Sequence, residues 1–134
     1  MNKQMVAILI VTRSSDLEHG LVALLESIPG LSAVKVIQEI PRAIDWIERH
    51  LPAIVLLDLD ISGRDPRDFL EKIRAVSAEI KRVILVNDLQ DVNRVPHYAE
   101  AILLKGGAPS SVVALITKLL STKGEENEYI RSND

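Results

Sequence analysis

The sequence predicts an α/β fold: a doubly wound, five-stranded parallel sheet with helices on both faces. Two observations point to this class. Continuous apolar runs, such as IVLL over residues 54–57, suit strands that are buried on both faces. These runs alternate along the chain with segments whose apolar residues recur at helical spacing. Strands that alternate with helices are joined by right-handed crossovers, which pack the helices against the sheet.

The predicted strands share an apolar run that leads into polar residues. They cover residues 5–11, 31–37, 53–57, 82–86 and 101–104. Lys35 interrupts the second run, which suits a strand at the edge of the sheet. Five such strands in a chain of 134 residues favour one domain with the flavodoxin-like order 2-1-3-4-5, in which the first and third strands are neighbours at the centre.

Caps and prolines predict the helix boundaries. Ser15 and Glu18 have the spacing of a capping box, which predicts Ser15 as the cap of the first helix. Pro41 suits the first turn of the second helix, and we expect the inward face of that helix to extend to Leu51. The Asp-Pro pair at residues 65–66 predicts a cap and a first-turn proline for the third helix.

Two segments lack a clear pattern. Residues 91–98 are polar and contain Pro96, so any helix there should be short or distorted. From Lys123 onward the chain is polar and has no apolar stripe. We therefore expect a folded domain over residues 1–122, followed by a polar tail or the start of a linker over residues 123–134.

Composition argues against several classes of function. A net charge of −3 gives no general attraction for nucleic acid, and the absence of cysteine excludes disulfides, thiolate metal sites and cysteine nucleophiles. No apolar run approaches the roughly 20 residues of a membrane helix, and the apolar opening has no signal-peptide cleavage site. We therefore expect a soluble, cytoplasmic protein that binds neither membranes nor nucleic acid directly.

Polar residues follow four of the predicted strands. In strand order, they are Thr12 with Arg13, Asp58, Asn87 with Asp88, and Lys105. The carboxyl ends of parallel strands meet at one edge of the sheet, where open α/β folds bind ligands. Asp58, which follows the third strand, is the residue that we most expect at a site. The alternative is a strand-end aspartate that only bonds turn amides.

Residues 52–75 (PAIVLLDLDISGRDPRDFLEKIRA) resemble the central stretch of receiver domains from two-component response regulators. In that family an aspartate after the third strand accepts a phosphoryl group, and it would be Asp58 here. The Gly-x-Asp turn of the family is matched by residues 63–65. Residues 101–107 (AILLKGG) resemble the family's fifth strand with its lysine, matched by Lys105. The resemblance covers residues 5–120 and implies a signalling module rather than an enzyme.

Several positions depart from the pattern of that family. Receivers carry an acidic pair after the first strand, which holds Mg²⁺ together with the phosphoacceptor, and those positions are Thr12 and Arg13 here. The hydroxyl residue after the fourth strand is replaced by Asn87. The proline after the family's lysine is replaced by Gly106, so we expect the peptide bond between Lys105 and Gly106 to be trans.

The loss of two carboxylates changes the charge of the predicted site. Mg²⁺ prefers six oxygen ligands and gives up water reluctantly, so it needs carboxylates or phosphates. We therefore expect no metal and no other cofactor. Asp60 and Asp88 are candidates for weak substitute ligands, but we interpret both as solvated loop charges. We expect Arg13 or Lys105 to pair with Asp58.

These observations predict a pseudo-receiver, which signals through protein–protein interaction without normal Mg²⁺-dependent phosphorylation. Its site positions are Asp58, Lys105 and Asn87. Two alternatives remain: an active but atypical phosphoacceptor that uses Asp58 with Mg²⁺, and a small flavodoxin-like domain that binds a nucleotide or another anion. The resemblance implies a histidine kinase or an output domain as partner. It also implies a homodimer through residues 91–98, the strand over 101–104 and the helix that begins at Pro109.

Overall fold

Five parallel strands form the central sheet, in the order β2-β1-β3-β4-β5. The computed structural model describes residues 6–62, 66–88, 90–91 and 99–121. The strands are β1 (Ala7–Val11), β2 (Ala33–Ile37), β3 (Ile54–Asp58), β4 (Lys81–Val86) and β5 (Ala101–Leu104). The predicted strand order is therefore confirmed, with β1 beside β3 in the interior of the sheet and β2 at an edge.

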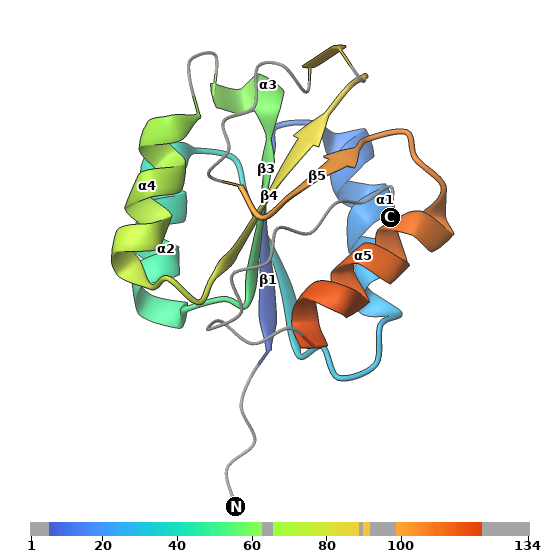
Figure 1. Cartoon of the computed structure of the whole chain (residues 1–134), viewed down its shortest axis with the longest axis horizontal. Helices are drawn as coiled ribbons and strands as arrows, with labels where there is room; N and C mark the ends of the chain where they lie inside the picture. Colours follow the sequence, from blue (N-terminus) through green and yellow to red (C-terminus); the bar gives the residue numbers. More distant parts are fainter. Residues whose placement is uncertain (1–5, 63–65, 89, 92–98, 122–134) are drawn as a thin grey trace, which may run out of the picture.

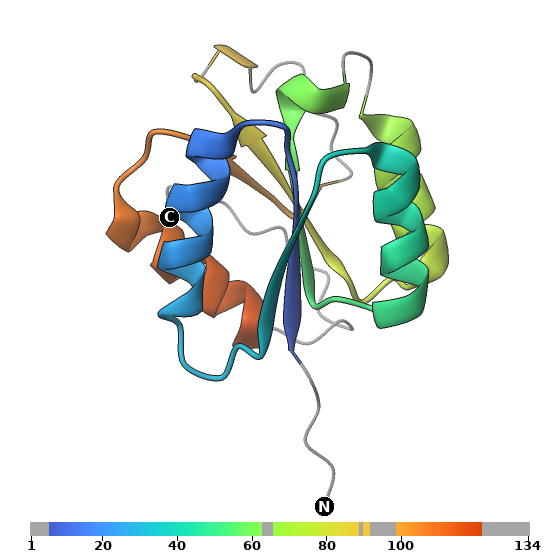
Figure 2. The same ribbon diagram turned by 180° about the vertical axis from the view of Figure 1, so that it is seen from behind.

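Helices cover both faces of the sheet and make a three-layer structure (Figures 1 and 2). On one face α1 (Ser15–Glu26) lies beside α5 (Pro109–Ser121), and on the other α2 (Ile40–His50) packs against α4 (Arg67–Val76). A single helical turn, α3 (Leu59–Ser62), follows β3 directly. The predicted doubly wound α/β class is confirmed, although the sequence pattern does not predict α3.

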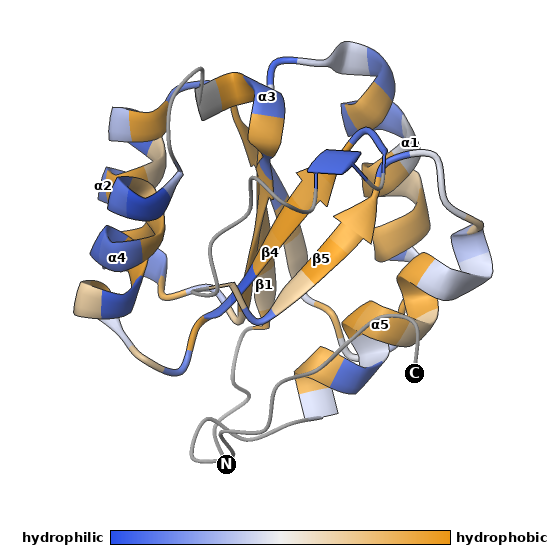
Figure 3. Cartoon of the chain, turned by 45° about the horizontal axis from the view of Figure 1, so that its top comes forward, coloured by the Kyte–Doolittle hydropathy of each residue, from blue (hydrophilic) through white to orange (hydrophobic). Residues whose placement is uncertain are grey.

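The strands β1, β3 and β4 are buried along their whole length. Alternate residues of a strand point to opposite faces, so the sheet contributes to two apolar clusters. Ile8 and Leu56 belong to the cluster under α1 and α5, whereas Leu9 and Leu57 belong to the cluster under α2 and α4. Apolar residues accordingly occupy the strands and the inner sides of the helices (Figure 3). Each fully buried side chain of this size contributes about 1.5–3 kcal/mol, which fixes the strand ends that carry the site.

The cap of α1 is Ser14, not the predicted Ser15. The hydroxyl of Ser14 accepts the backbone N–H of Leu17 at 3.1 Å. The backbone of Ser14 is extended (φ −83°, ψ 115°), as a capping position requires, whereas Ser15 is already helical. Ser14 and Ser15 each carry a hydroxyl that could cap the helix. The capping-box spacing to Glu18 indicated Ser15, but Ser14 is the residue that caps α1.

Two further boundaries differ from the predictions. Leu51 is 57% exposed, so its predicted inward orientation is wrong. Its backbone is left-handed (φ 48°) and its N–H donates to the carbonyl of Ile47, which ends α2 before the side chain reaches the core. Pro66 occupies the capping position of α4 rather than its first turn, and the helix begins at Arg67.

Several expectations fall on residues outside the described ranges: the cap at Asp65, residues 92–98 of the weak segment, and the tail over 123–134. Within the described ranges, no peptide bond is cis, so the expected trans bond between Lys105 and Gly106 is confirmed. In the same part of the chain, no helix has the length and apolar character needed to cross a membrane.

Candidate functional site

The carboxyl ends of the strands meet at one edge of the sheet, at the top of Figure 1. Because β3 is the middle strand, its last residue, Asp58, lies between the ends of β1 and β4. Asp58 is only 4% exposed. A carboxylate this deeply buried needs hydrogen-bond donors or an opposite charge, because burial without partners is strongly unfavourable. Asp58 therefore occupies the predicted place in the fold, and its partners decide what it does there.

Both carboxylate oxygens of Asp58 are engaged. Oδ2 accepts the hydroxyl of Thr12 at 2.7 Å. Oδ1 accepts the backbone N–H of Asp60 at 3.0 Å and lies 2.5 Å from Nζ of Lys105. Of the two cations expected to pair with Asp58, Lys105 is thus the one that does.

Thr12 is held in place for this contact by its own neighbours. Its backbone N–H donates to the carbonyl of Ile37 at the end of β2, and its hydroxyl oxygen accepts the N–H of Ser14 at 3.1 Å. With that bond accepted, the hydroxyl proton is directed to Asp58. Thr12 is 1% exposed. The residue that replaces a carboxylate of the receiver pattern therefore acts as a hydrogen-bond donor to the remaining one, a role that the sequence did not predict.

Asp60 belongs to the site, so its interpretation as a solvated loop charge is wrong. Its Oδ2 lies 3.0 Å from Nζ of Lys105 and accepts the side-chain amide of Asn87 at 2.8 Å. The side chain remains 53% exposed, yet it joins the ends of three strands, β3, β4 and β5. The helical turn α3 causes this placement, because it curls the chain back over the end of β3. The signal in the sequence is the two-residue spacing from Asp58 to Asp60.

The ammonium of Lys105 sits between two carboxylates. Its side chain is 17% exposed. Burial on its own would lower the pKa of Lys105, but hydrogen bonds and charge attraction from Asp58 and Asp60 outweigh that effect and raise the pKa above its ordinary value. Lys105 is therefore a permanent cation at neutral pH. With two carboxylates and one ammonium, this group of three carries a formal charge of −1.

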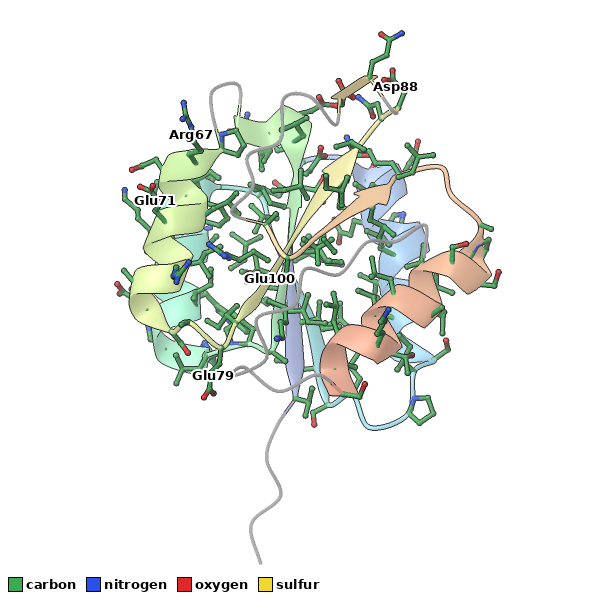
Figure 4. The ribbon with its side chains drawn as sticks, viewed as in Figure 1. Arg67, Glu71, Glu79, Asp88 and Glu100 are labelled. Carbon is green, nitrogen blue, oxygen red and sulfur yellow. The ribbon has the colours of Figure 1, made fainter. Side chains whose placement is uncertain are left out.

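The other candidate residues lie apart from Asp58. Arg13 is exposed, and its Nε donates to the carbonyl of Gln38 at 3.2 Å, beyond the end of β2. Asp88 is also exposed, and its Oδ1 accepts the N–H of Gln90 at 2.8 Å. It projects from the rim of the molecule in Figure 4, which agrees with its interpretation as a loop charge.

The residues at the strand ends do not fit a Mg²⁺ ion. Over the described residues, no group of three or more Asp, Glu, His or Cys side chains is arranged to hold a metal. The two carboxylates that are present, Asp58 and Asp60, already share the ammonium of Lys105. A dication would have to displace that ammonium and find further oxygen ligands in addition.

Comparison with known proteins gives a limited match in sequence. No family model matches the chain. A curated protein, the protein-glutamate methylesterase/protein-glutamine glutaminase of Treponema pallidum (strain Nichols), is 30% identical over 94 residues. The match covers 70% of this chain, but the chain spans only 23% of the length of that protein.

Solved structures match over nearly the whole described fold. A two-component response regulator from Clostridium difficile has a TM-score of 0.73 and 21% identity, with 87% of this chain and 96% of that chain covered. A LuxR-family two-component response regulator from Aurantimonas sp. SI85-9A1 has a TM-score of 0.73 and 20% identity, over 89% and 88% of the two chains. The signal receiver domain of NarL from Mycobacterium tuberculosis has a TM-score of 0.69 and 19% identity, over 89% and 99%. This chain therefore has the fold of the receiver domains of two-component response regulators.

Proposed function

We propose that this chain is a pseudo-receiver: a signalling module of a two-component or phosphorelay system that acts by protein–protein interaction, without normal Mg²⁺-dependent phosphorylation. The observation that carries the proposal is the engagement of Asp58. A carboxylate nucleophile must present a lone pair to the phosphorus atom, and three of the roughly four acceptor sites of Asp58 are taken by Thr12, Lys105 and the N–H of Asp60.

The charge of the site supports the same proposal. Phosphoryl transfer relies on a metal ion to offset negative charge on the donor and in the transition state. Among the residues that the structure describes, the donor would meet two carboxylates and one ammonium at this site, while Arg13 is engaged with Gln38. Two like charges about 4 Å apart repel by roughly 4 kcal/mol at the effective dielectric constant of a protein surface. Without a metal, the approach of a phosphoryl donor is therefore opposed rather than assisted.

In this proposal the three site residues have structural roles. Asp58 is the buried anchor, Lys105 is its counter-ion, and the amide of Asn87 ties the end of β4 to the same group. The module is not an enzyme. It transmits a signal by binding a histidine kinase or an output domain, and it extends over residues 1–122.

We also propose β5 and α5 as the surface for a second copy, together with residues 91–98. Leu104, on β5, is 36% exposed and directly precedes Lys105. An apolar contact at Leu104 would thus bury surface next to the site. Chemical cross-linking that locates intermolecular contacts on α2 or α4 instead would contradict this part of the proposal.

One observation favours the alternative of an active, atypical phosphoacceptor. Asp58 and Lys105 are the two site residues of the receiver pattern that this sequence retains, and they form an ion pair with each other. In this alternative Asp58 would be the nucleophile once Lys105 leaves its Oδ1, and Lys105 would then be free to contact the phosphoryl group. Phosphorylation of Asp58 would then depend on whether its ion pair with Lys105 can break.

Phosphorylation of the purified protein separates the two functions. The chain is incubated with acetyl phosphate and MgCl₂ and its intact mass is measured, with Asp58→Asn as the matched control. We expect no added phosphoryl group on either protein and no binding of beryllofluoride. We also expect Asp58→Asn to keep partner binding. A phosphoryl group on the wild-type protein that is absent from Asp58→Asn would overturn the pseudo-receiver proposal.

A further inference from the structure

The two carboxylates of the site require a cation between them. Nζ of Lys105 contacts Oδ1 of Asp58 at 2.5 Å and Oδ2 of Asp60 at 3.0 Å, so the two oxygens lie close to each other. The side chain of Asp58 is 5% exposed, and water therefore screens its charge poorly. Without a positive charge between them, the carboxylates would repel each other in a site of low dielectric constant.

Within the described residues, three sources of positive charge are conceivable at this edge of the sheet. Arg13 is directed to the carbonyl of Gln38. A metal ion lacks a third carboxylate or histidine ligand within the described part of the chain. Lys105 remains, and its Nζ lies within ion-pair distance of both carboxylates.

Asp60 makes this cation a fixed one. A lysine paired with one carboxylate can turn about its flexible stem, but Nζ of Lys105 is held from two sides. Oδ2 of Asp60 also accepts the amide of Asn87, so the end of β4 is joined to the end of β5 through one carboxylate oxygen. In this arrangement Asp60 is a positioning residue, because it acts through Lys105 and Asn87.

We propose that Asp60 and Lys105 together replace a divalent metal ion, so that the folded state and the site geometry of this chain are independent of Mg²⁺. The ammonium supplies the positive charge, and Asp60 holds it over Asp58 while it ties β3, β4 and β5 at their carboxyl ends. The inference rests on the proposed function and deepens it: it states what stabilises the unphosphorylated site.

A double-mutant cycle tests the inference, with thermal unfolding measured in millimolar MgCl₂, in CaCl₂ and in EDTA. The proteins are wild type, Asp60→Asn, Lys105→Met and the double variant, with Lys118→Met as the control for loss of an exposed lysine. We expect the midpoint of the wild-type protein to be the same in all three solutions. We expect Asp60→Asn to lower the midpoint of the wild-type protein but to raise that of Lys105→Met, because the second carboxylate is unfavourable once the ammonium is gone.

Two results would overturn the inference. The first is a wild-type midpoint that is higher in MgCl₂ than in EDTA. The second is a change of midpoint on Asp60→Asn that has the same sign in the wild-type protein and in Lys105→Met. If Lys105→Met does not fold, amine labelling of the folded proteins replaces the cycle. Lys105 should react severalfold faster with an acetylating reagent in Asp60→Asn than in the wild-type protein, while Lys118 should react equally in both. An unchanged rate at Lys105 contradicts the positioning role of Asp60.

The two proposals fail separately. If acetyl phosphate phosphorylates the wild-type protein while its midpoint is unaffected by Mg²⁺, the pseudo-receiver function is wrong and the metal-independent site stands. If Mg²⁺ stabilises the protein and no phosphoryl group is added, the replacement of the metal by Lys105 is wrong and the pseudo-receiver function stands.

Discussion

Replacing Thr12 by valine removes one hydroxyl from the most buried contact of the site. Valine has nearly the same shape, so packing around β1 is kept, but Oδ2 of Asp58 loses the donor that lies at 2.7 Å. Thr12 and Asp58 are 1% and 4% exposed, so water cannot take over the bond. A hydrogen bond to a charged group contributes about 1.5–3 kcal/mol, and we expect Thr12→Val to lower the free energy of unfolding by about 2 kcal/mol.

Urea unfolding at neutral pH measures this effect, and thermal unfolding provides a second reading. For a chain of this size, about 2 kcal/mol corresponds to a fall of roughly 6–10 °C in the midpoint. Thr117→Val, on the exposed side of α5, is the matched control and should change little. In an Asp58→Asn background the effect of Thr12→Val should shrink, because the hydroxyl no longer bonds a charge. A loss below about 0.5 kcal/mol in the wild-type background, within the usual range for surface substitutions, would refute the reasoning.

Three further predictions concern other parts of the molecule. Glu100→Gln breaks the ion pair with Arg82, a residue that is 4% exposed, and should destabilise the protein by about 2–3 kcal/mol in urea, less than a fully buried pair because the Glu100 side chain is 31% exposed. Glu79→Gln, on the surface, should have little effect, and equal losses would contradict the role of the pair. Because the pKa of Lys105 is raised in the folded state, its contribution to stability is complete below the ordinary lysine pKa of about 10.4 and is lost as pH rises through the higher folded value. Lys105→Met should therefore flatten the alkaline limb of a stability–pH curve, and an unchanged limb would be evidence against the pairing. Leu51→Gly should stabilise the chain by about 0.5–1 kcal/mol in thermal unfolding, because Leu51 is left-handed and exposed; a lower midpoint would refute the strain.

The sequence predicts the fold well because the arrangement of the strands is decided by which apolar residues are buried. The apolar runs of β1 and β3 are covered on both faces, so the pattern itself reports their position in the interior. The pairing of Asp58 with a cation is also predictable, since the carboxyl ends of parallel strands meet at one edge. The sequence left Arg13 and Lys105 as alternatives, and the structure shows Lys105.

The sequence pattern does not predict contacts that depend on the conformation of a single backbone turn. Asp60 enters the site only because α3 forms after β3, and a four-residue helix leaves no periodic pattern in the sequence. The donor role of Thr12 depends on the direction of one hydroxyl, which the N–H of Ser14 decides. Arg82 is a further example. A charged residue at the start of a strand usually indicates an exposed strand end, but Arg82 is buried because Glu100 lies beside it.

The β4–β5 pair is fastened at both of its ends. At the carboxyl end, Asp60 joins Asn87 to Lys105. At the amino end, Arg82 is bonded to Glu100 through its backbone N–H and its guanidinium. Sliding one strand along the other would break a charged contact at one end or the other, and the Arg82–Glu100 contact is the more buried of the two. Contacts at both ends therefore oppose sliding of β4 along β5, so a protein that docks on this pair of strands would meet one pre-formed register.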